Sequence, residues 1–157
     1  MEVCGNPNFQ GVDAALNINA LRTEILQRYP MVDLFVLFVD RDGIAGRKAK
    51  TENIEKTLSG ELPKGRAFFA EVAWQEAEIF ILAGHSWPST WKWKEMRADA
   101  NVKNTFFKKL VKLQGTGNLP HEGRKKLMSE AMGNWRRIKT RCPEDVGLLI
   151  KRISDMP

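Results

Sequence analysis

Two aspartates, Asp40 and Asp42, stand one residue apart directly after an apolar run at residues 34–39, and Gly43 follows them. Because successive side chains of a strand point to opposite faces, acids two residues apart can lie on the same side. Close carboxylates repel each other, and each raises the pKa of the other unless a cation lies between them. Hard divalent ions such as Mg²⁺ or Mn²⁺ prefer oxygen ligands, so the pair predicts a divalent-metal site.

Two further acids, Glu76 and Glu78, follow a second apolar run at residues 66–73. We expect both at the start of a helix, on the same rim of the sheet as the aspartates. Side chains two residues apart on a helix point in different directions, so at most one is expected to face a metal ion. The other would complement the positive end of the helix dipole. Glu78 has apolar sequence neighbours, which favours burial beside a cation over solvation.

The elements that must position these acids follow from the apolar pattern. The runs at residues 34–39 and 66–73 are short and rich in Phe, Val and Ala, which predicts strands buried on both faces, as in a parallel sheet. A further strand is expected at residues 1–5. Helices are predicted at residues 14–29, with Asp13 as N-cap and Pro30 as its end, at 46–60, and at 74–84. This order predicts an α/β fold with parallel strands, whose ligands sit beyond the carboxyl ends of the strands.

The charge is unevenly distributed along the chain. Residues 1–84 carry 9 Lys and Arg against 12 Asp and Glu, whereas residues 85–157 carry 16 against 7, which together give the net charge of +6. We therefore predict an α/β domain at residues 1–84 and a basic helical region at residues 85–157. The basic region could meet a polyanion, although a solvated helix face also explains such a charge excess.

The basic region is expected to form helices at residues 105–113, at 124–139, and from Pro143 onward, with Glu144 and Asp145 in the first turn of the last one. Trp87, Trp91 and Trp93 alternate with cations, a pattern used for stacking on nucleic acid, but we favour packing of these rings. His85 and His121 receive no role. The candidate nucleic-acid contacts are Lys92, Lys94, Arg124, Lys125, Lys126, Arg136 and Arg137.

Several classes of protein are excluded or disfavoured by composition. No apolar run approaches the ~20 residues that span a bilayer, and the first residues lack the basic and apolar segments of a signal peptide. Cys4 and Cys142 have no metal-ligand spacing and form no disulfide framework. Free thiols in a reducing cytoplasm are the expectation, with no membrane partner.

One enzyme class shares the pattern of an apolar run followed by "DRDG". It resembles the first motif of phosphatases of the haloacid dehalogenase type, in which Asp40 would be the nucleophile and Asp42 a general acid. That family also needs a Ser or Thr after a second strand, a distant Lys, and a later acidic pair. The only late pair, Glu144–Asp145, opens a helix in the basic region, so a metal-dependent phosphatase is the third interpretation.

A closer resemblance is to the TOPRIM (topoisomerase–primase) fold, and within it to small prokaryotic TOPRIM-like proteins of unknown function. It is carried by "VLFVDRDG", by "AWQEAEIFILA", and by a basic tail with "GRKKL" and "CPEDVGLLIKRI". The ordered set covers about the whole chain. The resemblance implies a TOPRIM-like parallel sheet with flanking helices and a Mg²⁺ site at Asp40 and Asp42, with Glu76 and Glu78 as further ligands. Among these, Asp40, Asp42 and Glu78 are the implied catalytic residues.

The chain departs from the TOPRIM pattern at its beginning. TOPRIM domains have a first strand that ends in an essential Glu, followed by a helix, before the strand that residues 1–5 resemble. Glu2 stands at the beginning of its predicted strand, so that role does not pass to it. We expect the fold to lack this first strand–helix unit, as in a fragment, or to be completed differently. An open sheet edge would then invite pairing with a partner protein or a second copy.

The function expected from these residues is divalent-metal-dependent processing of nucleic acid, foremost as a nuclease-like phosphodiesterase. Two metal-bound carboxylates would help to activate water and to stabilise the charge that develops on the phosphate. The alternative is a catalytically degenerate TOPRIM module that binds nucleic acid or a partner protein without cutting.

Overall fold

The computed structural model describes residue 9 and residues 11–156 and shows an α/β protein with a two-stranded parallel sheet. Its described residues fall into two compact units. The first comprises residues up to Val39 together with Ala45–Val72, and the second comprises Asp40–Ile44 and Ala73–Met156. The boundary predicted at residue 84 is the end of a helix inside the second unit. Within the described residues, no helix has both the length and the apolar character needed to cross a bilayer.

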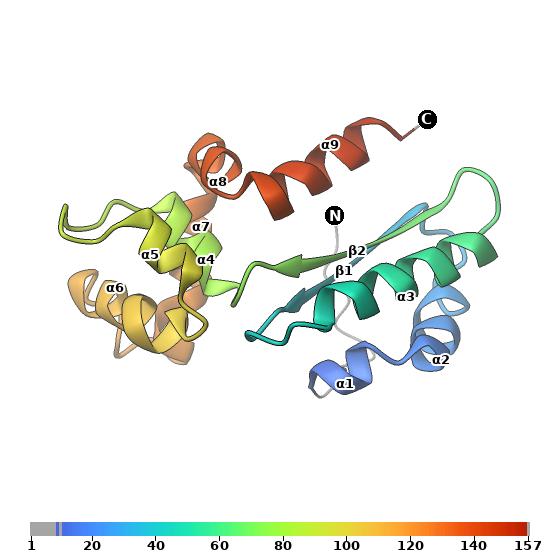
Figure 1. The fold of residues 1–157 in the computed structure, drawn as a ribbon, viewed down its shortest axis with the longest axis horizontal. Helices are drawn as coiled ribbons and strands as arrows, with labels where there is room; N and C mark the ends of the chain where they lie inside the picture. Colours follow the sequence, from blue (N-terminus) through green and yellow to red (C-terminus); the bar gives the residue numbers. More distant parts are fainter. Residues whose placement is uncertain (1–8, 10, 157) are drawn as a thin grey trace. The chain divides into compact units, whose positions relative to one another are not determined.

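The sheet consists of β1 (Leu34–Asp40) and β2 (Ala67–Ala73), which run side by side in Figure 1. They are joined by α3 (Arg47–Glu61), because parallel neighbours need a long crossover connection. The Ala67 N–H donates to the Asp33 carbonyl at 2.7 Å and sets the register at the start of the pair. Both predicted strands and the helix between them are confirmed, whereas the strand predicted at residues 1–5 lies outside the described residues.

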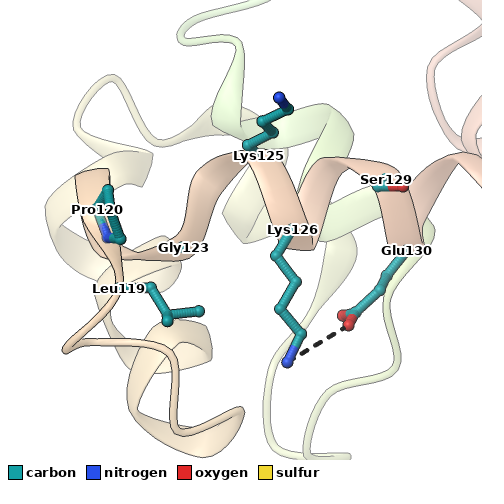
Figure 2. Close-up of a pocket in the computed structure, with 7 residues that line it drawn as sticks. All are labelled: Leu119, Pro120, Gly123, Lys125, Lys126, Ser129 and Glu130. Carbon is teal, nitrogen blue, oxygen red and sulfur yellow. Dashed lines mark ion pairs between the residues drawn. The ribbon is translucent and has the colours of Figure 1, made fainter.

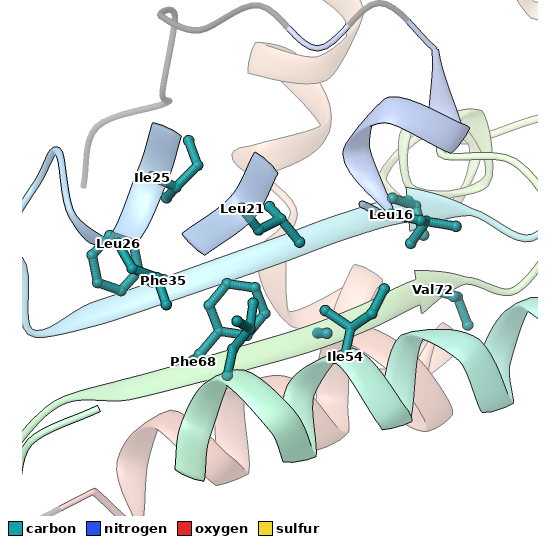
Figure 3. Close-up of a cluster of buried hydrophobic side chains, with 11 residues drawn as sticks. Leu16, Leu21, Ile25, Leu26, Phe35, Ile54, Phe68 and Val72 are labelled. Atoms are coloured by element: carbon teal, nitrogen blue, oxygen red, sulfur yellow. The ribbon is translucent and has the colours of Figure 1, made fainter. Parts of the chain in front are cut away.

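Only one face of the sheet is fully covered in the first unit. Phe35 and Val39 of β1 and Phe68 of β2 point into a single buried cluster. Val36, on the opposite face of β1, remains 39% exposed, so the prediction that this strand is buried on both faces is wrong. The reason is that residues before β1 and residues of α3 contribute to the same cluster, as Figure 3 shows. These members are Leu16, in the turn after α1, and the helical residues Leu21, Ile25, Leu26, Ile54 and Leu58.

The predicted helix at residues 14–29 is divided into three segments. They are α1 (Val12–Ala15), α2 (Ile18–Ala20) and the π-helical η1 (Leu21–Leu26). The division falls at Asn17, whose side chain accepts a hydrogen bond from the Ala20 N–H at 3.1 Å. Asparagine favours such local bonds and starts a new helix, so the prediction of one helix with Asp13 as its N-cap is wrong.

The second unit is built around α4 (Glu78–Gly84), which is buried along its whole length. The end of this helix packs closely on α7 (Arg124–Met132). A Cβ atom at Gly84 would lie 2.5 Å from the Cβ of Ala131, and 2.6 Å from its Cα. Gly84 therefore does more than end the helix, since only a residue without a side chain permits this approach.

Further short helices surround α4 in the second unit (Figure 1). The helix predicted at residues 124–139 is two helices, because Gly133 and Asn134, both poor helix formers, interrupt it. The predicted start of the last helical segment at Pro143 is confirmed. The remaining elements are α5 (Trp93–Ala98), η2 (Lys103–Phe107), α6 (Lys108–Leu113), η3 (Pro120–Gly123), α8 (Trp135–Arg141), η4 (Pro143–Gly147) and α9 (Leu148–Ser154).

The buried cluster of the first unit gives a stability prediction. Leu58 of α3 is completely buried in it, so Leu58→Ala removes apolar contacts and leaves a cavity. We expect urea denaturation to show a loss of about 2–5 kcal/mol in the free energy of unfolding. Met31, which is 90% exposed, is the control, and Met31→Ala should change stability by less than about 0.5 kcal/mol. Equal effects of the two substitutions would contradict this packing.

Candidate acidic site

Two loops at the carboxyl ends of the strands meet in the second unit. The Asp42 N–H donates to the Gln75 carbonyl at 3.0 Å, and the Gly43 N–H donates to the Gln75 Oε1 at 3.0 Å. Asp42 and Gly43 both have positive φ angles, 52° and 68°, and so form the sharp turn that the sequence suggested. Loops 40–44 and 73–77 are therefore joined through backbone and side-chain hydrogen bonds to Gln75.

Asp40 is the carboxylate at the centre of this arrangement. The Ala77 N–H donates to Asp40 Oδ1 at 2.7 Å, which fixes the orientation of the side chain. Burial raises the pKa of Asp40 above its ordinary value, the Ala77 hydrogen bond opposes this, and repulsion by Asp42, Glu78 and Glu76 raises the pKa further. Asp42, Glu76 and Glu78, which the sequence predicted on the same rim, thus lie close enough to act on the carboxyl group of Asp40.

The two glutamates contact different partners, although Glu76 lies in the loop before α4 and not on the helix on which both were expected. Glu76 Oε2 accepts a hydrogen bond from the Lys103 N–H at 2.7 Å, at the first turn of η2. Glu78 is only 7% exposed and forms an ion pair with Arg124, whose Nη2 lies 2.9 Å from Glu78 Oε1. The burial predicted for Glu78 is confirmed, and the cation beside it in the structure is the guanidinium of Arg124. A metal ion beside Glu78 stays a prediction.

The acids have the chemistry but not the closed geometry of a metal centre. Carboxylate oxygens suit Mg²⁺ and Mn²⁺, and Asp42 is exposed while Asp40 is half-buried, so an ion could reach the pair from solvent. Among the described residues, however, no three His, Cys, Asp or Glu side chains are grouped as metal ligands. Asp40 and Asp42 stay the candidates for metal contact that the sequence predicted, and Asp42 is the most exposed of the four acids.

A buried ion-pair network supports the second loop. Arg97 Nη1 lies 3.1 Å from Asp145 Oδ2, and Arg97 Nη2 lies 2.8 Å from Glu144 Oε2. Asp145, which is 3% exposed, also accepts a hydrogen bond from the Trp74 N–H at 3.2 Å. The sequence indicated only a role at a helix N-terminus for these acids. No local pattern pointed to Arg97 as their partner, because the three residues meet only through the tertiary fold.

The thiol beside this network is not a reactive group. Cys142 is fully buried and forms no disulfide. Burial is the largest of several effects that raise the pKa of Cys142 to about 12, so the thiol stays protonated at neutral pH and nucleophilic chemistry is disfavoured. Cys4 lies outside the described residues.

The predicted nucleic-acid contacts are mostly on the surface of the second unit. Arg124 is the exception, since its guanidinium pairs with Glu78. Lys92 Nζ donates to the Ser89 carbonyl at 3.2 Å, and Arg137 Nη1 donates to Ser86 Oγ at 3.2 Å. The exposed cations of this set are Lys92, Lys94, Lys125, Lys126, Arg136 and Arg137.

Two of these lysines, Lys125 and Lys126, line an open surface pocket. They line it together with Leu119, Pro120 and Ser129, and Figure 2 shows the two lysine side chains extending in different directions from the helix. Lys126 Nζ lies 3.9 Å from Glu130 Oε1, a solvent-exposed ion pair that contributes little to stability. The pocket thus offers cations to a ligand but no buried polar group that would fix one.

The tryptophans of the basic connector pack within the second unit, as the sequence analysis favoured. The rings of Trp87 and Trp93 stack with centroids 5.7 Å apart. The Arg141 guanidinium lies 3.9 Å from the centroid of Trp87, and Trp93 Nε1 donates to the Arg141 carbonyl at 3.1 Å. These contacts hold the connector against α8 and explain the aromatic spacing without a ligand.

No protein-family model, no curated protein and no solved structure matches this chain. The TOPRIM resemblance therefore stays a prediction from the sequence.

The raised pKa of Asp40 predicts a pH-dependent effect of Asp40→Asn. A carboxyl whose pKa is higher in the folded than in the unfolded state lowers the free energy of unfolding when it is ionised. This loss is complete at pH values above the folded pKa and absent at pH values below the unfolded pKa. In metal-free buffer, Asp40→Asn should therefore raise the free energy of unfolding at pH 7, because Asn keeps an oxygen acceptor for Ala77. The gain should shrink as the pH falls toward the unfolded pKa of aspartate. A gain that does not change with pH, in urea titrations from pH 3 to 7, would contradict this.

The Arg124–Glu78 ion pair predicts a non-additive double mutant. Arg124→Gln leaves a buried carboxylate without its cation, and we expect a loss of about 1–3 kcal/mol in the free energy of unfolding, less than for a fully buried pair because Arg124 is partly exposed. Adding Glu78→Gln should restore part of this loss. Lys125→Gln, one residue along the same helix, is the matched control and should be nearly neutral. Additive single and double effects would show that the two side chains do not interact.

Proposed function

We propose that this protein binds a divalent metal ion, Mg²⁺ or Mn²⁺, through Asp40 and Asp42 and cleaves phosphodiester bonds in nucleic acid. The observation that carries the proposal is that Asp40, held by the Ala77 N–H, lies near Asp42, Glu76 and Glu78 on two joined loops. Burial is the largest cause of the raised pKa of Asp40, and repulsion by these three acids raises the pKa further. Repulsion of this kind is relieved by a cation, and perturbed carboxyls cluster at functional sites. The TOPRIM resemblance implies the same metal and the same pair of residues.

The distribution of charge supports nucleic acid as the substrate. The second unit carries 17 Lys and Arg against 11 Asp and Glu, a net of +6, whereas the first unit carries eight of each. The whole positive excess therefore belongs to the unit that contains the acidic site. A unit with an excess of positive charge attracts a polyanion, while the acidic site itself repels phosphate until a metal ion is bound.

Each residue of the site has a defined task in this proposal. Asp40 and Asp42 would hold the ion, which supplies activation of water and stabilisation of charge on the phosphate when bound. The Ala77 N–H orients Asp40, and the two hydrogen bonds to Gln75 fix the backbone around Asp42. Glu76 and Glu78 contribute negative potential from fixed positions rather than direct contact.

A second candidate function is a module that binds nucleic acid or a partner protein without cutting it. It is favoured by the pairing of Glu78 with Arg124 and of Glu76 with the Lys103 N–H. Both contacts hold a predicted metal ligand to another part of the protein.

The two functions are separated by an assay on labelled single- and double-stranded DNA and RNA, with Mg²⁺, with Mn²⁺ and with EDTA. We expect metal-dependent cleavage that Asp42→Asn lowers by about 100-fold or more, because the ion loses a ligand. Asp155→Asn, which removes an exposed acid at the end of α9, should leave the rate unchanged. Binding without cleavage in every metal would instead support the non-cleaving module.

A further inference from the structure

Trp74 differs from the other tryptophans in its exposure and in its place next to the acidic loops. It directly follows the buried Ala73 at the end of β2 and precedes Gln75, which joins the two loops. Its side chain is 37% exposed, the highest value among the five tryptophans, all of which the structure describes. An exposed indole at a rigid position needs an explanation other than core packing.

Two guanidinium groups lie over the Trp74 ring. The Cζ atom of Arg41 is 4.9 Å from the ring centroid, and that of Arg97 is 5.4 Å away. Arg97 is held in place, because it is 9% exposed and paired with Asp145 and Glu144. Arg41 makes no ion pair among the described residues and is more exposed to solvent. Of the two arginines, Arg41 is therefore the one that a ligand could displace from the ring.

The backbone of Trp74 is fixed on both sides before any ligand arrives. Its N–H donates to the buried Asp145, and the next residue, Gln75, accepts hydrogen bonds from Asp42 and Gly43. An aromatic side chain has few rotatable bonds, so a ring on such a support loses little conformational entropy when a ligand stacks on it.

We propose that Trp74 is a stacking platform for an unpaired base of single-stranded nucleic acid, and that Arg41 leaves the ring to contact a phosphate next to that base. The inference deepens the proposed function and rests on it for the choice of nucleic acid as ligand. Arg41 lies between Asp40 and Asp42 in the sequence, so a base on Trp74 would place the neighbouring backbone close to the acidic site. Bases within a duplex are already stacked, so the platform favours single strands.

The inference is tested by fluorescence anisotropy in EDTA, with fluorescein-labelled single-stranded 12-mers of DNA and of RNA, and with an abasic 12-mer of the same charge. Trp74→Leu keeps an apolar side chain but removes the aromatic face. We expect it to weaken binding of the base-bearing strands by about 5- to 100-fold and to leave binding of the abasic strand within about twofold. Trp74→Phe should retain most of the affinity, and Trp135→Leu is the matched control.

Arg41 is tested in the same assay through its charge. Arg41→Gln should weaken binding of base-bearing and abasic strands alike, and should lower the slope of log affinity against log salt by about one. A Trp74→Leu variant that binds all strands as the wild type does would overturn the inference. The inference would also be overturned if Trp74→Leu weakened the binding of base-bearing and abasic strands equally. The same holds if the wild-type protein bound no single strand.

The binding and cleavage assays distinguish a failure of this inference from a failure of the proposed function. Because the binding assay contains EDTA, it does not depend on metal or on cleavage, and Asp42→Asn should bind the strands at least as well as the wild type. Trp74-dependent binding without metal-dependent cleavage contradicts the phosphodiesterase and leaves the platform standing. Cleavage with Trp74-independent binding contradicts the platform alone.

Discussion

The hydrogen bond from the Ala77 N–H to Asp40 Oδ1 is the contact on which the candidate site depends. It joins the last residue of β1 to the residue that precedes α4, and so connects the loop after β1 with the loop after β2. With the two bonds to Gln75, it turns two separate loops into one unit. The cost is that Asp40 is held half-buried beside three other acids, which raises its pKa.

The protein balances this negative charge unequally. Arg124 neutralises Glu78, and the Lys103 N–H satisfies one oxygen of Glu76, so these two acids are anchored by the helices around α4. Asp40 and Asp42 sit on the loop itself, with Asp42 open to solvent. A separate network fixes the loop at residues 73–77. In it, Arg97 pairs with Asp145, and Asp145 accepts a hydrogen bond from the Trp74 N–H. The cluster is therefore built by the fold, and it is the place where we propose that a divalent cation binds.

Sequence patterns predicted those features that depend on neighbours in the chain. The two strands follow from apolar runs, and the four acids were singled out because they come directly or within a few residues after these runs. The breaks at Asn17 and Gly133 were missed, because the apolar periodicity continues through them while a local hydrogen bond or a flexible residue ends the helix. The exposure of Val36 and the pairing of Arg97 with Asp145, 48 residues away, depend on tertiary packing, which no local pattern encodes.

The central claim, that the acids of the two loops form a site for a divalent cation, is tested most directly by the carboxyl carbon resonance of Asp40. Its pKa is measured by NMR titration with and without Mg²⁺. The account predicts a pKa above that of ordinary aspartate in metal-free buffer, and a clear fall when Mg²⁺ is added, because the ion favours the ionised form. A pKa that Mg²⁺ leaves unchanged at millimolar concentration, or one that is not raised without metal, would contradict the account.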